Sequence, residues 1–116
     1  MTEGGCLFCR IVAGDIPSTR LHEDDLVVAF RDISPQAPTH LLVVPRRHIA
    51  SLAELGESDG PLLGRMFAVV ADLAASEGIA GDGFRVVANA GANGGQTVDH
   101  IHLHLLGGRR MTWPPG

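Results

Sequence analysis

Three histidines alternate with apolar residues near the C-terminal end of the chain: His100, His102 and His104. Alternate side chains of a β-strand point to one face, so the imidazoles are expected in a row, roughly 6.5–7 Å apart. Imidazole titrates near neutral pH and can act as a nucleophile, an acid or a base. Covalent catalysis and metal binding by His-x-His both remain open here. Core packing alone is disfavoured, because three imidazoles on one face are hard to explain by packing.

A glycine-rich segment, residues 91–95, comes shortly before these histidines. Glycines let backbone N–H groups approach a phosphate closely, and Gln96 and Thr97 add side-chain donors. Glycine-rich loops usually only turn the chain. Beside three imidazoles, however, this segment predicts an oxyanion cradle.

Cys6 and Cys9 have the two-residue spacing of a zinc knuckle. A disulfide redox motif would need a preceding strand in a βαβ unit, and neither is indicated. A structural zinc site needs four ligands, so two more are required. The alternative interpretation is a pair of buried free cysteines.

The apolar pattern predicts an α+β fold, with an antiparallel sheet of about five strands and one long and one short helix. The long helix is expected over residues 61–77, between Pro61 and Gly78, and the short one over 7–13, ending at Gly14. The near-continuous apolar run 40–44 predicts a strand that is buried on both faces. The other strands are expected near 19–22, 26–30, 84–89 and 98–106.

The length of 116 residues fits one domain, 1–116. The net charge is −4, and all nine basic residues are arginines without a basic run, so we expect no nucleic-acid partner. No segment is apolar enough to span a membrane, and the N-terminus lacks the features of a secretory signal. We therefore expect a cytoplasmic protein that binds no membrane.

The run His100–Leu106 matches the His-φ-His-φ-His-φφ signature of the histidine-triad superfamily, where φ is apolar. Residues 29–49, 89–108 and 111–116 resemble its Hint branch, the purine nucleoside phosphoramidases. The resemblance implies a histidine-triad (HIT) fold and hydrolysis of the P–N bond in purine nucleoside 5′-phosphoramidates. It also implies a covalent nucleotidyl-histidine intermediate and no catalytic metal.

The resemblance assigns a role to each matching residue. His102 is the nucleophile, His104 contacts the phosphate, and His40 supports and orients the triad that begins with His100. Thr97 stands where serine is common, and Asp99 where an aromatic residue is frequent. The residues expected to bind substrate are Asn89, Gly95, Gln96 and Thr97 around the phosphate and leaving group, Asp32 at the ribose hydroxyls, Ile33 at the sugar or base, and Phe8 and Ile16 at the adenine.

Other branches of the superfamily, including the uridylyltransferases, bind zinc with two cysteines, an upstream histidine and the first triad histidine. The residues in those positions here are Cys6, Cys9, His48 and His100. Animal Hint proteins usually lack these cysteines. The chain thus combines a C-terminal tail typical of the Hint branch with N-terminal cysteines typical of the zinc-binding branches. The expected zinc is structural and would join the first helix to the sheet.

The resemblance further implies a homodimer with sheets joined across the interface, and Trp113 is expected to reach toward the partner's site. Two rival functions remain at this point. One is a dinucleoside polyphosphate hydrolase that uses the same nucleophile. The other is a nucleotide-binding scaffold with incidental hydrolysis.

Overall fold

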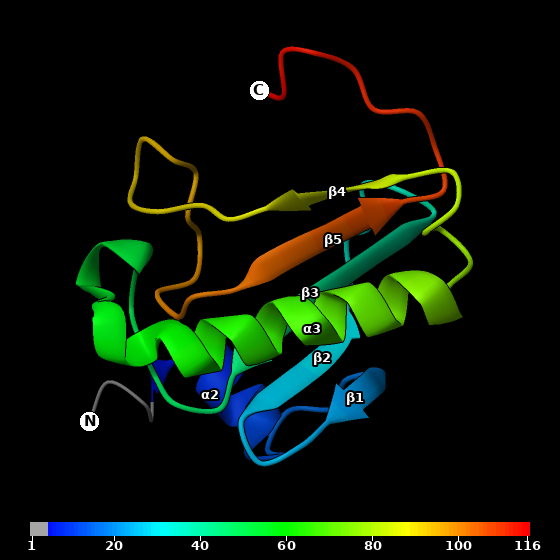
Figure 1. Ribbon diagram of the computed structural model, residues 1–116. Helices are drawn as coiled ribbons and strands as arrows, with labels where there is room; N and C mark the ends of the chain where they lie inside the picture. Colours follow the sequence, from blue (N-terminus) through cyan, green and yellow to red (C-terminus); the bar gives the residue numbers. More distant parts are fainter. Residues whose placement is uncertain (1–4) are drawn as a thin grey trace.

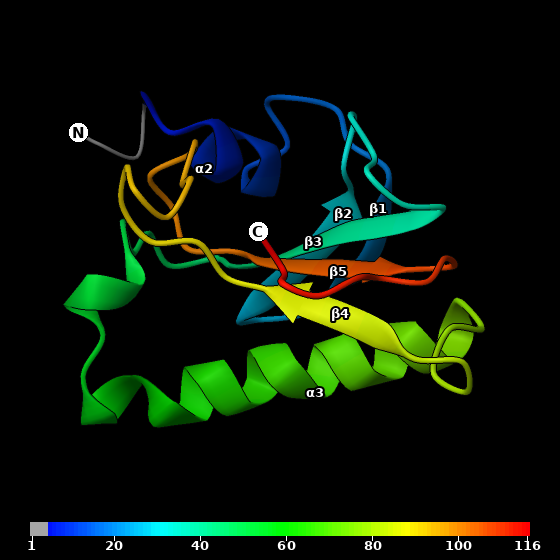
Figure 2. The same ribbon diagram turned by 90° about the horizontal axis from the view of Figure 1, so that it is seen from above.

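The computed structural model describes residues 5–116. It contains a five-stranded antiparallel sheet with the order β1-β2-β3-β5-β4, which confirms the α+β prediction. The long helix α3 covers one face and the short helix α2 packs on the other (Figures 1 and 2). The elements are α2 (Leu7–Val12), β1 (Arg20–Glu23), β2 (Val27–Arg31), β3 (Thr39–Pro45), α3 (Gly60–Ser76), β4 (Phe84–Val87) and β5 (Leu103–Gly107), with short 3-10 turns at Leu52–Glu54 and Glu57–Asp59.

The sheet separates two apolar clusters. Alternate residues of β2 and β3, with Leu103 and Leu105 of β5, pack against the buried face of α3. The intervening residues, such as Phe30 and Leu42, pack against Phe8 and Ile11 of α2. Because both faces are covered, every residue of β3 is buried, as the apolar run predicted.

Both helices end as predicted at glycines with positive φ, Gly14 (+86°) after α2 and Gly78 (+76°) after α3. Cys6 caps the N-terminus of α2, and its Sγ accepts the backbone N–H of Cys9. Within residues 5–116, no helix combines the length and apolar character needed to cross a membrane.

The strand predicted over 98–106 is shorter than expected and begins only at Leu103. Residues 98–102 make other backbone hydrogen bonds: the Ile101 N–H donates to the Ile49 carbonyl, and the His100 N–H to the Val98 carbonyl. The alternation still holds across the boundary. Ile101 and Leu103 lie in the core beneath α3, while the rings of His100 and His102 contact Phe8 of α2.

Candidate active site

The proton on the His102 ring is located by a backbone contact. Nδ1 lies 2.7 Å from the carbonyl oxygen of His100, which can only accept, so Nδ1 carries the hydrogen. The lone pair is therefore on Nε2, which makes no hydrogen bond within residues 5–116. The side chain is only 6% exposed. The ring thus has a fixed tautomer with one unshared nucleophilic nitrogen.

A second chain of hydrogen bonds locates the proton on His104. The backbone N–H of Gln36 donates to Nδ1 of His40 at 3.0 Å, so the hydrogen of His40 is on Nε2. This Nε2 lies 2.9 Å from Nδ1 of His104 and donates to it. His104 consequently carries its own hydrogen on Nε2, where it is a donor beside the His102 ring (4.9 Å between centroids).

Asp32 completes what we call the active-site cluster: Asp32, His40 and His104. Its Oδ2 lies 3.4 Å from Nε2 of His40, and its Oδ1 accepts the N–H of Ser34. Burial lowers the pKa of His40, although Asp32 opposes this effect. Burial, then the neighbouring His102 and His40, lower the pKa of His104 to about 4. Both rings are therefore neutral at neutral pH, as the hydrogen-bond chain requires.

The residues expected at the sugar and base lie in different environments. Ile33 is 97% exposed, directly beside Asp32 in the chain. Ile16 is half-buried against the cluster beneath α2. Phe8 is only 4% exposed, and its ring packs edge-on against His102 with 4.9 Å between centroids. Phe8 therefore supports the His102 ring directly, a contact that the sequence did not indicate.

Much of the hydrogen-bonding capacity of the glycine-rich loop is used within the loop and its surroundings. The Gln96 amide donates to the carbonyls of Ala50 and Val98 and accepts the N–H of Gly91, so it retains no donor. The Asn89 side-chain amide donates to the Gly94 carbonyl, and the backbone N–H of Gly95 donates to the Ala92 carbonyl. Gln96 thus shapes the loop, whereas Thr97 is exposed.

The second group, the Cys/His cluster, consists of four side chains whose ligand atoms all lie within 4.8 Å of one another: Cys6, Cys9, His48 and His100. Nδ1 of His100 lies 3.4 Å from both sulfurs, and Nδ1 of His48 lies 3.2 Å from Cys9 Sγ. Around a tetrahedral zinc ion, sulfur and nitrogen ligands are about 3.5 Å apart. The donors therefore fit zinc in type, number and spacing.

The proton of His100 is also held by the backbone. Its Nε2 donates to the Pro45 carbonyl at 2.8 Å, which leaves the lone pair on Nδ1, facing the sulfurs. Beside this cluster, a hollow of about 570 Å³ is lined by residues that include Cys6, His48, Thr97 and Asp99. The hollow gives solvent access to two of the four side chains.

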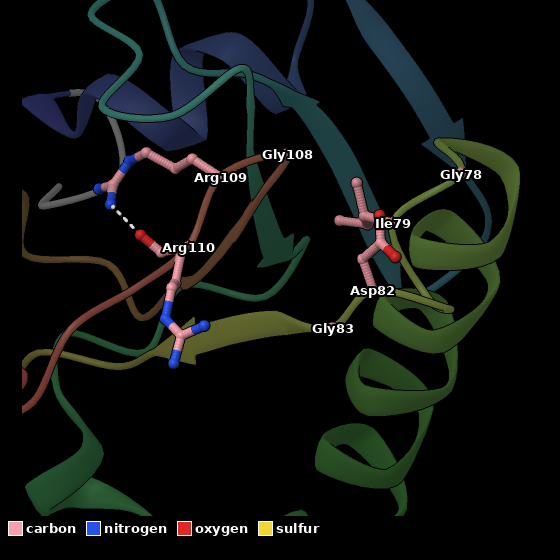
Figure 3. A pocket seen from close by; sticks show the side chains of 7 residues that line it. All are labelled: Gly78, Ile79, Asp82, Gly83, Gly108, Arg109 and Arg110. Atoms are coloured by element: carbon pink, nitrogen blue, oxygen red, sulfur yellow. Dashed lines mark hydrogen bonds between the residues drawn. The ribbon is translucent and has the colours of Figure 1, made fainter.

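Another hollow, of about 340 Å³, lies beyond the C-terminal end of β5 and contains none of the expected site residues. Figure 3 shows Arg109 and Arg110 on one side of it, with Ile79 and Asp82 on the other side. Arg109 also donates to the carbonyl of Gln36 at 3.1 Å, the residue whose N–H holds His40. The sequence did not point to Gln36 or Pro45, because they hold His40 and His100 through a backbone N–H and a backbone carbonyl, and residue type does not reveal such contacts.

Comparison with known proteins agrees with this geometry. The HIT domain model matches residues 13–111. The chain is 50% identical over 105 residues to a purine nucleoside phosphoramidase of Escherichia coli, covering 90% of this chain and 88% of that protein. It is 49% identical over 110 residues to an uncharacterized HIT-like protein of Synechococcus elongatus, covering 95% and 96%.

Solved structures agree as well. A HIT family hydrolase from Legionella pneumophila has a TM-score of 0.95 and 53% identity, covering 96% of this chain and 99% of that one. A histidine triad protein from Clostridium difficile has a TM-score of 0.90 and 42% identity, covering 93% and 94%. Family match, identity and fold together show that this chain belongs to the HIT domain family.

Proposed function

We propose that this nucleotide hydrolase of the HIT family cleaves the P–N bond of purine nucleoside 5′-phosphoramidates, with His102 as the nucleophile. The observation that carries the proposal is the hydrogen bond from His102 Nδ1 to the His100 carbonyl, which leaves Nε2 unprotonated and unshared. The 50% identity to a protein named purine nucleoside phosphoramidase supports the choice of substrate.

In the first step, the lone pair of His102 Nε2 attacks the α-phosphorus. The P–N bond to the leaving amine breaks, its electron pair stays on the nitrogen, and a proton from solvent water converts that nitrogen to the free amine. The Nε2–H of His104 donates to a phosphate oxygen and stabilises the charge that develops there. The His100 carbonyl stabilises the positive charge that forms on the His102 ring.

In the second step, water attacks the phosphorus of the nucleotidyl-imidazole. The bond from phosphorus to His102 Nε2 breaks and its electron pair returns to Nε2. The attacking water loses a proton to solvent, and the nucleoside monophosphate leaves with the oxygen of that water. The carboxylate of Asp32, beside the active-site histidines, is proposed to accept hydrogen bonds from the ribose hydroxyls. The exposed Ile33 and the half-buried Ile16 are proposed to contact the sugar and base, and Asn89, Gly95 and Thr97 the phosphate and leaving group.

The test is AMP release from adenosine 5′-phosphoramidate, with wild type beside His102→Ala and with diadenosine polyphosphate as a second substrate. We expect fast release from the phosphoramidate by wild type and a loss of roughly 10⁵-fold in the variant. His22→Ala is a matched control, since His22 lies in β1 and binds Asp24. Preference for the polyphosphate would favour P–O cleavage, and no release from either substrate would favour a binding protein.

We also propose that Cys6, Cys9, His48 and His100 hold a structural zinc ion. Two lone pairs on imidazole and two thiolates would satisfy its preferred tetrahedral set. Such an ion would join α2 to the segments that carry His48 and His100, and His102 Nε2 would not be one of its ligands. The content of zinc per chain after purification in zinc-containing buffer tests this assignment.

A homodimer is proposed as the working assembly. The strand β4 is at an edge of the sheet and offers unpaired backbone groups to a second copy. Phe84 on β4 and Phe67 on α3 are exposed, and Trp113 is 82% exposed on the C-terminal tail. Sedimentation of wild type beside Phe84→Asp would test it: we expect a dimer and a monomer, respectively.

A further inference from the structure

Two contacts connect the Cys/His cluster to the nucleophile. The ring of His100 belongs to the cluster, while its carbonyl accepts the Nδ1–H of His102 at 2.7 Å. Phe8 lies between Cys6 and Cys9 in the chain and packs edge-on against the His102 ring. We infer that metal bound by this cluster positions the nucleophile. The inference rests on the proposed role of His102 and on the proposed zinc site.

The first contact depends on how the peptide carbonyl of His100 is held. This residue precedes β5, so the β-ladder does not fix it. Its ring is held at both nitrogens instead, by the Pro45 carbonyl at Nε2 and by the two sulfurs at Nδ1. Because ring and carbonyl belong to one residue, fixing the ring restrains the acceptor that sets the tautomer of His102.

The second contact depends on helix α2, which has only six residues. An isolated helix of this length is unstable in water, so tertiary contacts must hold it. Apolar packing of Phe8 and Ile11 supplies part of the restraint. A metal on Cys6 and Cys9 would add two bonds at the start of the helix, and these bonds would fix the Phe8 ring against His102.

Metal loss should therefore affect turnover more than substrate binding. Without metal, thiols and imidazoles retain only weak hydrogen bonds, and both restraints on His102 loosen. Small displacements of a catalytic group commonly reduce turnover by one to two orders of magnitude. The hollow of about 570 Å³ that reaches Cys6 and His48 would let metal exchange in the folded protein.

The test uses His48→Ala, because His48 has no hydrogen bond or ring contact with His102 within the described residues 5–116. We expect loss of bound zinc and a fall of about 10- to 100-fold in kcat, with KM changed less than about twofold. His48→Cys supplies a Cys₃His set, which also binds zinc, and should restore both zinc content and kcat. The ¹⁵N shifts of the His102 ring report its tautomer independently of activity: we expect Nδ1–H with metal and a mixture without it.

Asp24→Asn controls for general loss of stability. Asp24 lies outside both clusters and accepts hydrogen bonds from the Leu26 and Val27 amides and from Arg65. We expect a lower Tm, unchanged zinc content and unchanged kcat at a temperature where the variant is folded.

Three outcomes would overturn the inference: a zinc-free His48→Ala with wild-type kcat, an equal loss of kcat in Asp24→Asn, or wild type without zinc. If wild type hydrolysed no nucleotide, the proposed function would fail. The His102 tautomer with and without metal would then still decide the positioning role: a change would support it, and no change would overturn it.

Discussion

Histidine occurs in both the active-site cluster and the Cys/His cluster, but its ring presents a hydrogen-bond donor in the first and a lone pair in the second. In the active-site cluster, Nδ1 of His40 accepts a backbone N–H and its Nε2–H donates to Nδ1 of His104. His104 therefore presents an N–H at its own Nε2. In the Cys/His cluster, His100 gives its N–H to the Pro45 carbonyl, so that a lone pair faces the sulfurs. The difference lies in the backbone partner, which is a donor in one cluster and an acceptor in the other.

The two clusters thus differ in the tautomer of their histidines rather than in residue type, and the tautomer decides which kind of ligand each could bind. A histidine that presents an N–H binds an anion well, while one that presents a lone pair binds a cation. Substitutions of single residues test this distinction.

The largest effect within the active-site cluster is expected for His104. His104→Ala removes the Nε2–H, and loss of one such donor commonly lowers kcat about 10²- to 10³-fold. His104→Gln keeps an N–H donor and should recover part of this loss. Steady-state hydrolysis of adenosine 5′-phosphoramidate measures both. Equal losses in the two variants would show that the donor is not the feature that matters.

The second prediction concerns which of the two clusters binds zinc, and its expected effect is on zinc content and Tm. Asp32, His40 and His104 also lie close enough to hold a metal, but His40 and His104 present hydrogens in this arrangement. We expect one zinc per chain, retained in His40→Ala and lost in Cys6→Ser. Zinc loss should lower the Tm by roughly 10 °C, because ligand in 100-fold excess over its Kd contributes about 2.7 kcal/mol.

Elemental analysis and thermal unfolding of the same samples provide the measurement. Two zinc ions per chain, or loss of zinc in His40→Ala, would contradict the distinction between the two clusters.

The smallest effect concerns pH. The pKa of His104 is about 4 in the folded chain and near its ordinary 6.5 when unfolded, so the unfolded chain binds more protons between these values. Stability should therefore fall as pH decreases from 6.5 to 4. Since the ring is partly exposed, we expect about 1–2 kcal/mol from this group.

Urea unfolding of wild type and His104→Gln at pH 7 and pH 4.5 would measure that contribution. The variant should lose less stability than wild type over this interval. An equal loss in both proteins would show that the pKa of His104 is the same in the folded and unfolded states.

The fold class, the order of the elements and the candidate site residues all followed from the residue pattern. Period-two and helical patterns show which faces are apolar, and so predicted a fully buried β3, the long helix and its end at Gly78. The alternation at residues 100–105 placed Ile101 and Leu103 in the core even though β5 starts later than predicted.

The position of each proton and the residues that support the site depend on contacts between distant segments. The Gln36 N–H and the Pro45 carbonyl act through the backbone, which every residue type shares. The contact of Phe8 with His102 joins segments that are far apart in the chain, so no local pattern encodes it. Residue types define the possible chemistry, while the direction of each hydrogen bond depends on partners that only folding brings together.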